Sequence, residues 1–350
     1  MPNRAERRRA ERLGIVLRAT PTQCRIDLED WDPENAKMVW SDPRPDALQR
    51  GFIELAELLA ELADDPAVVT LVIPVDLAEA VQKRQPDVPY TIESGSGLVG
   101  GRTMATPDGR IDVIINAGWL LAYDENNVPI LNPEPMTVIR RTVTHEAQHV
   151  VMHQRLSGFD EYGFDAVEGN FNRQLAGNAA KLCDEHRAEW QAVQLTEPEL
   201  PSVGAVTDVL EALGKQLADV NNAYQAASGE PDAVWDLARG VFTACGPFWT
   251  SLGYWTAQHR ADDANIADLP AEIAALPLWQ RYGGNVWSLL QDSLRPLPVE
   301  DLTTSGEVLG AAAELVASTL TSSLETIGFT YEDTDAGAAF YITRFDFPDQ

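Results

Sequence analysis

Two histidines, His145 and His149, stand four residues apart, and Glu146 directly follows the first. On a helix such residues lie one turn apart on the same face, with Cβ atoms roughly 5–6 Å from each other. Two imidazoles placed so can bind one zinc ion at roughly 2.0–2.1 Å. Zinc lowers the pKa of a bound water to about 7, so a neighbouring carboxylate suffices as general base. The pattern therefore indicates metal-assisted hydrolysis, with Glu146 as the base.

The HExxH pattern is informative because histidine is scarce in this chain. With 5 histidines among 350 residues, a chance match is expected in about one such chain in two hundred. His153 continues the four-residue spacing, but it lies about 12 Å along the helix axis from His145. We therefore expect His153 to support a ligand or face solvent. The alternative is a polar helix face that binds no metal.

His145 and His149 can bind the same ion only if they lie on a helix, and the sequence of residues 132–158 predicts one. Asn132 can cap its N-terminus, and Pro133 suits the first helical position. Gly158 can adopt the left-handed conformation that ends a helix. The sequence therefore predicts one helix with defined ends around the motif.

A four-coordinate zinc site that keeps a water needs a third protein ligand. One class of zinc peptidase uses a histidine six residues past the second, but Arg155 occupies that position. A glutamate from a later helix is the other solution, and residues 173–193 predict that helix. Glu185 is the preferred ligand, because Glu189 lies one turn further on the same face and can hydrogen-bond a ligand imidazole. Three residues remain alternatives as the ligand: Asp184, His186 and Glu189.

The two motifs together resemble the IrrE/ImmA-like group of minimal gluzincins. In that group an HExxH helix, often with a further histidine, is followed by Glu-x-x-Ala-Asn/Asp-x-x-Ala. Residues 145–153 read HEAQHVVMH and residues 185–192 read EHRAEWQA, with Glu189 where the group has Asn or Asp. The resemblance covers about residues 98–195 and implies a zincin-like core and the cleavage of a transcriptional repressor. It implies zinc ligands at His145, His149 and Glu185 and a base at Glu146.

The chain before the motif has α/β character. Apolar periodicity predicts the following elements: strands at 15–19, 24–28 and 68–75, helices at 46–63 and 76–84, and a hairpin of 98–104 with 110–116 around Pro107-Asp108-Gly109. In zinc peptidases an edge strand beside the metal can hold a substrate in extended form. The hairpin provides either such an edge or a purely structural one.

The C-terminal half is predicted to be helical. We expect helices at 205–228, 232–259, 271–294 and 299–327, and a last strand at 338–345 that returns to the N-terminal sheet. The aromatic residues of this half, Tyr254 among them, indicate core packing.

A peptidase also needs a donor for the oxyanion. The candidates are Tyr162, His186 and His259.

These elements predict an α+β fold, with a zincin-like core of a small mixed sheet, the HExxH helix and the Glu185 helix, and a largely α-helical C-terminal part. The expected organisation is a basic leader at 1–14, an α/β metallopeptidase domain at 15–195, a helical domain at 196–337, and a strand and tail at 338–350.

Composition restricts the partners and the compartment. The net charge of −28 and the pI near 4.4 argue against a general nucleic-acid binder. The basic leader can bind nucleic acid or an acidic partner, or it is a solvated, frayed end. No apolar run is long enough to span a membrane. Three distant cysteines and the absence of a secretory signal predict a cytoplasmic protein with reduced thiols.

The leading hypothesis is a zinc-dependent metalloendopeptidase that cleaves a protein or peptide. A second hypothesis is a zincin-fold acidic binding protein without hydrolytic activity, which acts as a decoy or regulator of a partner. In a third, HExxH is accidental and the chain is an acidic helical interaction protein.

Overall fold

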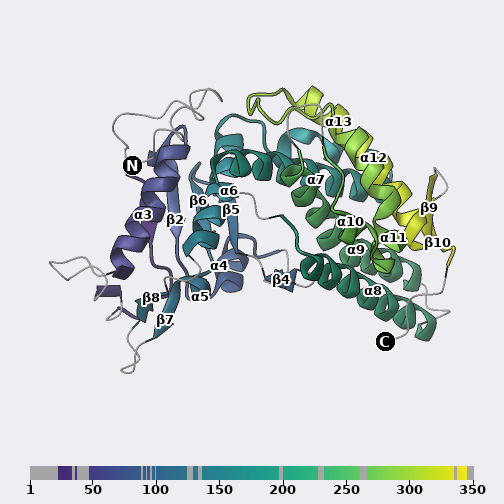
Figure 1. The fold of residues 1–350 in the computed structure, drawn as a ribbon, viewed down its shortest axis with the longest axis horizontal. Helices are drawn as coiled ribbons and strands as arrows, with labels where there is room; N and C mark the ends of the chain where they lie inside the picture. The colour runs from purple at the N-terminus through teal and green to yellow at the C-terminus, as the bar shows by residue number, and fades with distance from the viewer. Residues whose placement is uncertain are drawn as a thin grey trace. The chain divides into compact units, whose positions relative to one another are not determined.

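A computed structural model describes residues 23–33, 36–37, 47–87, 90–91, 93–94, 97–98, 100–123, 129–132, 136–196, 200–227, 232–260, 266–334 and 337–344. The chain is α+β and packs as two compact units (Figure 1). The sheet unit comprises the described residues up to 94, 98–156 and 191–197. The helical unit comprises those of 95–97, 157–190 and 198–350. One helix, α7 (Asn170–Leu195), contributes residues to both.

The sheet unit is built on a four-stranded mixed sheet of order β1-β2-β6-β5. The strands β1 (Arg25–Asp27), β2 (Val69–Val72) and β6 (Ile111–Ile115) run parallel. Strand β5 (Gly101–Ala105) pairs antiparallel with β6 and ends the order. All residues of β2 and β6 are buried, as expected for strands covered on both faces.

Helices cover both faces of this sheet. On one face α3 (Ala47–Leu62) and α6 (Met136–Gln154) share a core with strand residues such as Leu71 and Val113. On the other face α4 (Leu77–Arg84) packs against Val72 and Ile114. Successive strand side chains alternate between the faces, so α6 meets the face of Val113. The smaller elements of this part of the chain are η1 (Pro66–Val68), β3 (Glu93–Ser94), β4 (Gly97–Leu98), α5 (Ala117–Leu120), β7 (Leu121–Tyr123) and β8 (Pro129–Leu131).

The helical unit surrounds a core rich in aromatic residues. Phe242, Phe248 and Trp249 of α9 are each at most 2% exposed, so the predicted packing role of these aromatics is confirmed. Its elements are η2 (Phe159–Tyr162), η3 (Phe164–Ala166), most of α7, α8 (Val203–Ala226), α9 (Ala233–Gln258), α10 (Ala271–Ala274), α11 (Pro277–Tyr282), α12 (Gly284–Leu294), α13 (Gly306–Ile327), β9 (Phe329–Thr334) and β10 (Gly337–Ile342).

A side chain from β9 caps the N-terminus of α7. The Asp333 Oδ2 atom accepts hydrogen bonds from the backbone N–H groups of Phe171 and Asn172, each at 2.9 Å. Gly169 precedes the helix with φ 87°, and a Cβ there would meet Asp333 Oδ2 at 2.5 Å. The cap satisfies two backbone donors that a helix N-terminus leaves unpaired.

Most predicted elements are present, including the C-terminal strand, but the prediction that this strand returns to the N-terminal sheet is wrong. Strand β10 pairs antiparallel with β9 in a separate hairpin and does not join the N-terminal sheet. The single helix predicted at 271–294 is three helices, because Pro277 starts α11 and Gly283 caps α12. The helix predicted from residue 299 begins at Gly306.

The C-terminal end of the HExxH helix also differs from the prediction. The described helix begins at Met136, and Pro133 lies outside the described residues. After the helix, Leu156 takes the left-handed conformation with φ 51°, whereas Gly158 has φ −88°. The basic leader and the strand predicted at 15–19 also lie outside the described residues.

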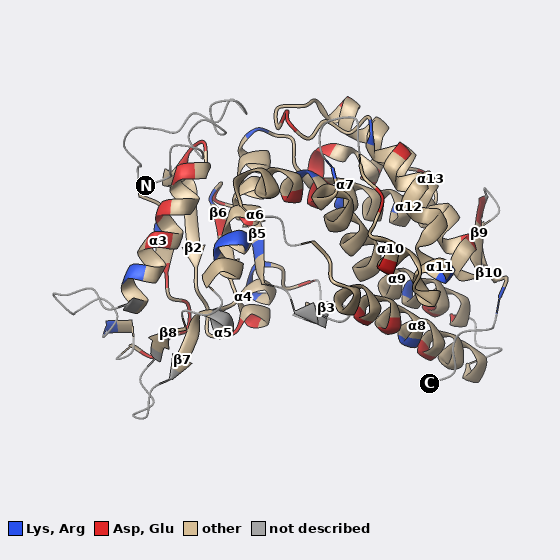
Figure 2. Cartoon of the chain, viewed as in Figure 1, with Lys and Arg blue, Asp and Glu red and all other residues tan. Residues whose placement is uncertain are grey.

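Acidic side chains occur on helices of both units, α3 and α8 among them (Figure 2). The acidic residues behind the formal net charge of −28 are therefore not confined to one unit. Within the described part of the chain, no helix combines the length and the apolarity needed to cross a bilayer.

The three cysteines are buried and unbridged. Burial raises the pKa of the Cys24 thiol to about 11 and raises the pKa of the Cys183 and Cys245 thiols further.

Because the thiolate is the reactive species, we expect the native protein not to react with Ellman's reagent at pH 8. In guanidinium, which unfolds the chain, we expect all three thiols to react. Rapid native labelling would contradict the buried positions of these side chains.

Candidate metal centre

The two motif histidines lie on α6, whose Val143 and Val150 pack into the core of the sheet unit. His145 is 8% exposed and His149 is partly buried. Their Nε2 atoms lie 3.2 Å apart, and their ring centroids are 5.0 Å apart with an interplanar angle of 68°. The two nitrogens therefore lie side by side on one face of the helix, as the spacing predicts.

The spacing of these nitrogens fits a shared metal ion. In a tetrahedral site with metal–nitrogen bonds of 2.0–2.1 Å, two ligand nitrogens are separated by roughly 3.3–3.4 Å. The observed 3.2 Å between His145 Nε2 and His149 Nε2 agrees with this separation. Both nitrogens can be ligands of the same ion without a change of helix geometry.

Glu185 supplies the third donor. Ligand atoms of His145, His149 and Glu185 all lie within 4.8 Å of one another. This group could therefore hold a metal ion, and two imidazoles with one carboxylate are a donor set used by catalytic zinc sites. Among the residues that the structure describes, no other trio of His, Cys, Asp and Glu comes this close. The alternative ligands Asp184, His186 and Glu189 are not members of the group.

Glu146 is buried beside the histidines, at 7% exposure, and is held by strand β5. Thr103 Oγ1 donates a hydrogen bond to Glu146 Oε2 at 2.7 Å. A Cβ added at Gly101 would meet Glu146 Cγ at 3.0 Å, so the strand and the glutamate are in close contact. Sequence reasoning missed Thr103, because its orientation depends on the pairing of Thr103 with Val113 across the sheet.

The carboxylates of α7 are bound by side chains of α9. Tyr254 Oη donates to Glu185 Oε2 at 2.9 Å, and Gln258 Nε2 donates to Glu189 Oε1 at 2.7 Å. The sequence predicts only core packing for Tyr254, so the hydrogen bond to Glu185 is a contact that the sequence does not predict. The predicted bond from Glu189 to a ligand imidazole stays a prediction.

His186 does not have the surroundings of an oxyanion donor. It is fully buried, with Nδ1 3.2 Å from Gly253 O and 3.0 Å from Thr256 Oγ1, and Nε2 accepts a hydrogen bond from Arg260 at 3.0 Å. Burial, together with the nearby Arg260 cation, holds the pKa of His186 well below its usual value. The neutral ring thus joins α7 to α9 inside the helical unit.

The two other donor candidates are also packed into the helical unit. Tyr162 is 4% exposed, and burial raises the pKa of its phenol well above the usual value. His259 Nδ1 lies 2.8 Å from Trp255 O, and its ring packs edge-on against Trp287. These contacts do not support the predicted donor role. His153 is partly buried and is not part of the metal-binding group.

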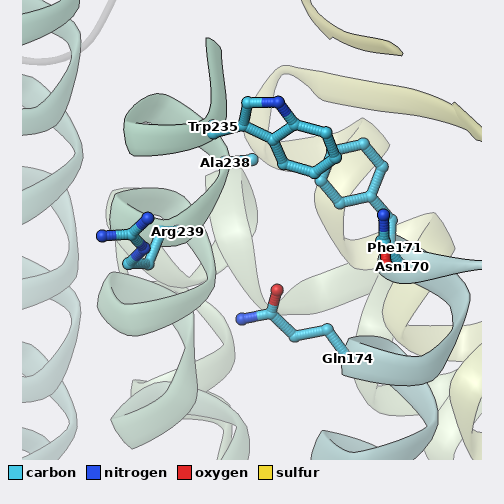
Figure 3. A pocket seen from close by; sticks show the side chains of 6 residues that line it. All are labelled: Asn170, Phe171, Gln174, Trp235, Ala238 and Arg239. Atoms are coloured by element: carbon cyan, nitrogen blue, oxygen red, sulfur yellow. The ribbon is translucent and has the colours of Figure 1, made fainter. Parts of the chain in front are cut away.

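A cavity of about 310 Å³ lies elsewhere in the helical unit, where α7 begins beside α9 (Figure 3). The Trp235 and Phe171 rings pack together at its side, with centroids 5.3 Å apart. Its polar lining residues are Asn170, Gln174 and Arg239. No proposed metal ligand lines this cavity.

A buried arginine connects α7 to other segments of the helical unit. Arg187 is fully buried and donates to three backbone carbonyls, of Ser157, Pro298 and Asp301. These bonds connect α7 to the segments before α7 and before α13.

We expect Arg187→Met to lower the free energy of unfolding by about 3 kcal/mol or more, because buried carbonyls left without a donor cost about 1–3 kcal/mol each. Urea unfolding measures the loss. Arg239→Met is the matched control, since exposed ion pairs such as that of Arg239 with Asp236 contribute less than about 1 kcal/mol. Equal losses in the two variants would contradict the structural role of Arg187.

Comparison with known proteins gives no match to a protein family, to a curated protein or to a solved structure. The resemblance to IrrE/ImmA-like gluzincins therefore stays a prediction that the two motifs carry.

Proposed function

We propose that this chain is a zinc-dependent metalloendopeptidase that hydrolyses a protein or peptide substrate. The observation that carries the proposal is the convergence of His145, His149 and Glu185, with the carboxylate of Glu146 buried next to the first histidine. Zinc, when bound, supplies a Lewis acid that polarises the scissile carbonyl and acidifies water. The free, buried thiols are consistent with a reducing, cytoplasmic location, which we also propose.

Glu146 is the proposed general base. It takes a proton from the attacking water and transfers it to the leaving amine. The hydrogen bond from Thr103 holds Oε2, which leaves Oε1 as the proton acceptor, since a carboxylate offers two oxygens. The base is thereby fixed in one orientation before substrate arrives.

The position of strand β5 at the edge of the sheet favours a peptide as the substrate. Strand β5 ends the strand order and carries Thr103, which contacts the base. An extended peptide that adds to such an edge forms backbone hydrogen bonds independently of its side chains. Pairing with β5 would bring the peptide backbone alongside Glu146.

The alternative function is a binding protein that keeps the metal site without hydrolysis. The charge of −28 favours it, since an acidic surface can engage a basic partner. Zinc content does not separate the two functions, whereas cleavage of a broad peptide library does. Zinc bound in stoichiometric amount would exclude the third hypothesis, an accidental motif.

The purified protein is expected to bind about one zinc per chain, and His149→Ala is expected to lose it, because two protein ligands hold the ion weakly. Metal analysis by mass spectrometry measures the content. His153→Ala is the matched control on the same helix and retains zinc. A wild-type protein that takes up no zinc would refute the proposal.

Glu146→Gln is expected to retain zinc and to lower kcat by about 10²–10⁴-fold, because the amide cannot accept the proton. Cleavage of a peptide library by the zinc-loaded protein measures the effect. Full activity in this variant would eliminate Glu146 as the base.

Thr103→Val keeps the side-chain shape but removes the hydrogen bond to Glu146. We expect an unchanged zinc content and a kcat lower by roughly tenfold, the equivalent of one hydrogen bond to a charged group. Thr142→Val is the control, because the Thr142 hydroxyl donates to Val138 O within α6. Similar kcat values for the two variants would show that Thr103 does not position the base.

A further inference from the structure

We infer that helix α9 positions the third zinc ligand, with Tyr254 holding the Glu185 carboxylate and Gln258 holding the neighbouring Glu189. The inference rests on the proposed function in that it takes Glu185 as a ligand. All four residues belong to the helical unit, and α9 lies outside the sequence range that resembles minimal gluzincins. The contacts that hold the proposed third ligand thus lie within the helical unit.

The contact consists of two parallel hydrogen bonds. Tyr254 Oη lies 2.9 Å from Glu185 Oε2, and Gln258 Nε2 lies 2.7 Å from Glu189 Oε1. Donors and acceptors are each four residues apart, so the two bonds lie one helical turn from each other on both α9 and α7. This repeated spacing fixes the axial register of the two helices at the ligand.

The backbones of α7 and α9 approach closely at this point. A Cβ at Gly253 would meet the backbone O of Leu182 at 3.1 Å, which is too tight for an ordinary contact. His186 extends the contact, with Nδ1 3.2 Å from the backbone O of Gly253 and 3.0 Å from Thr256 Oγ1. Glu185 therefore lies on a segment of α7 held on both sides of the ligand position.

The chemistry of the donors suits a ligand carboxylate. The hydrogen bond from the Tyr254 hydroxyl to Oε2 orients the Glu185 carboxylate, as such bonds orient the ligands of metal sites. Phenol and amide donors are neutral, so they orient the carboxylates without cancelling the negative charge that a cation needs. A lysine or arginine at either position would form an ion pair that competes with the metal.

The test measures zinc affinity in the full chain by competition with a chelator of known affinity. Tyr254→Phe removes one oxygen from a packed ring, and we expect zinc binding to weaken by about 10–100-fold. Gln258→Met is a second variant, with a smaller loss expected because Glu189 is not a ligand. Tyr331→Phe is the matched control, since its hydroxyl donates to Asn172 of α7, about 20 Å along the helix from Glu185.

A spectroscopic measurement separates positioning from general stability. The visible absorption of the cobalt-substituted protein depends on ligand geometry, and we expect it to change in Tyr254→Phe but not in Tyr331→Phe. Thermal melting of the metal-free proteins shows whether each variant is folded.

The outcomes distinguish this inference from the proposed function. Folded Tyr254→Phe and Gln258→Met with wild-type zinc affinity and cobalt spectrum would overturn the positioning role and leave the zinc site standing. If Tyr254→Phe does not fold, wild-type affinity in Gln258→Met alone overturns it. A wild-type protein without zinc affinity refutes the proposed function and this inference together.

Discussion

The proposed metal centre imposes one constraint: ligand atoms of His145, His149 and Glu185 must lie close together, and in the structure they lie within 4.8 Å of one another. Within helix α6, the four-residue spacing places the two histidines on one face, where His145 Nε2 and His149 Nε2 lie 3.2 Å apart. The third donor, Glu185, is 36 residues beyond His149 in the sequence. Its position therefore depends on everything that holds α7.

Buried polar contacts hold the acidic segment of α7 in addition to the apolar packing of neighbours such as Leu182 and Cys183. Arg187 donates to three carbonyls, His186 bonds to Gly253 and Arg260, and Asp333 caps the first turn. Such contacts are directional, and a buried polar group left unpaired is costly. They specify one position and rotation of the helix, which the proposed ligand role of Glu185 requires.

The sequence predicted what depends on local spacing. The helices at 46–63 and 76–84, the hairpin with its turn, and the facing histidines follow from periodicities of a few residues. Contacts set by tertiary packing were not predictable. Thr103 reaches Glu146 only in one strand register, and Tyr254 reaches Glu185 only once α9 packs on α7. The prediction that the last strand joins the N-terminal sheet is wrong, because this strand pairs with residues 329–334, which the sequence patterns do not predict to be a strand.

The cap from Asp333 and the bond from Tyr254 have a consequence for dissecting the protein. A fragment ending near residue 195 would include both motifs and every proposed zinc ligand. It would lack the carboxylate that starts α7 and the phenol that orients Glu185. Both motifs can thus be present in a fragment that lacks contacts holding α7 and Glu185, one of which comes from β9, more than 130 residues past the last motif.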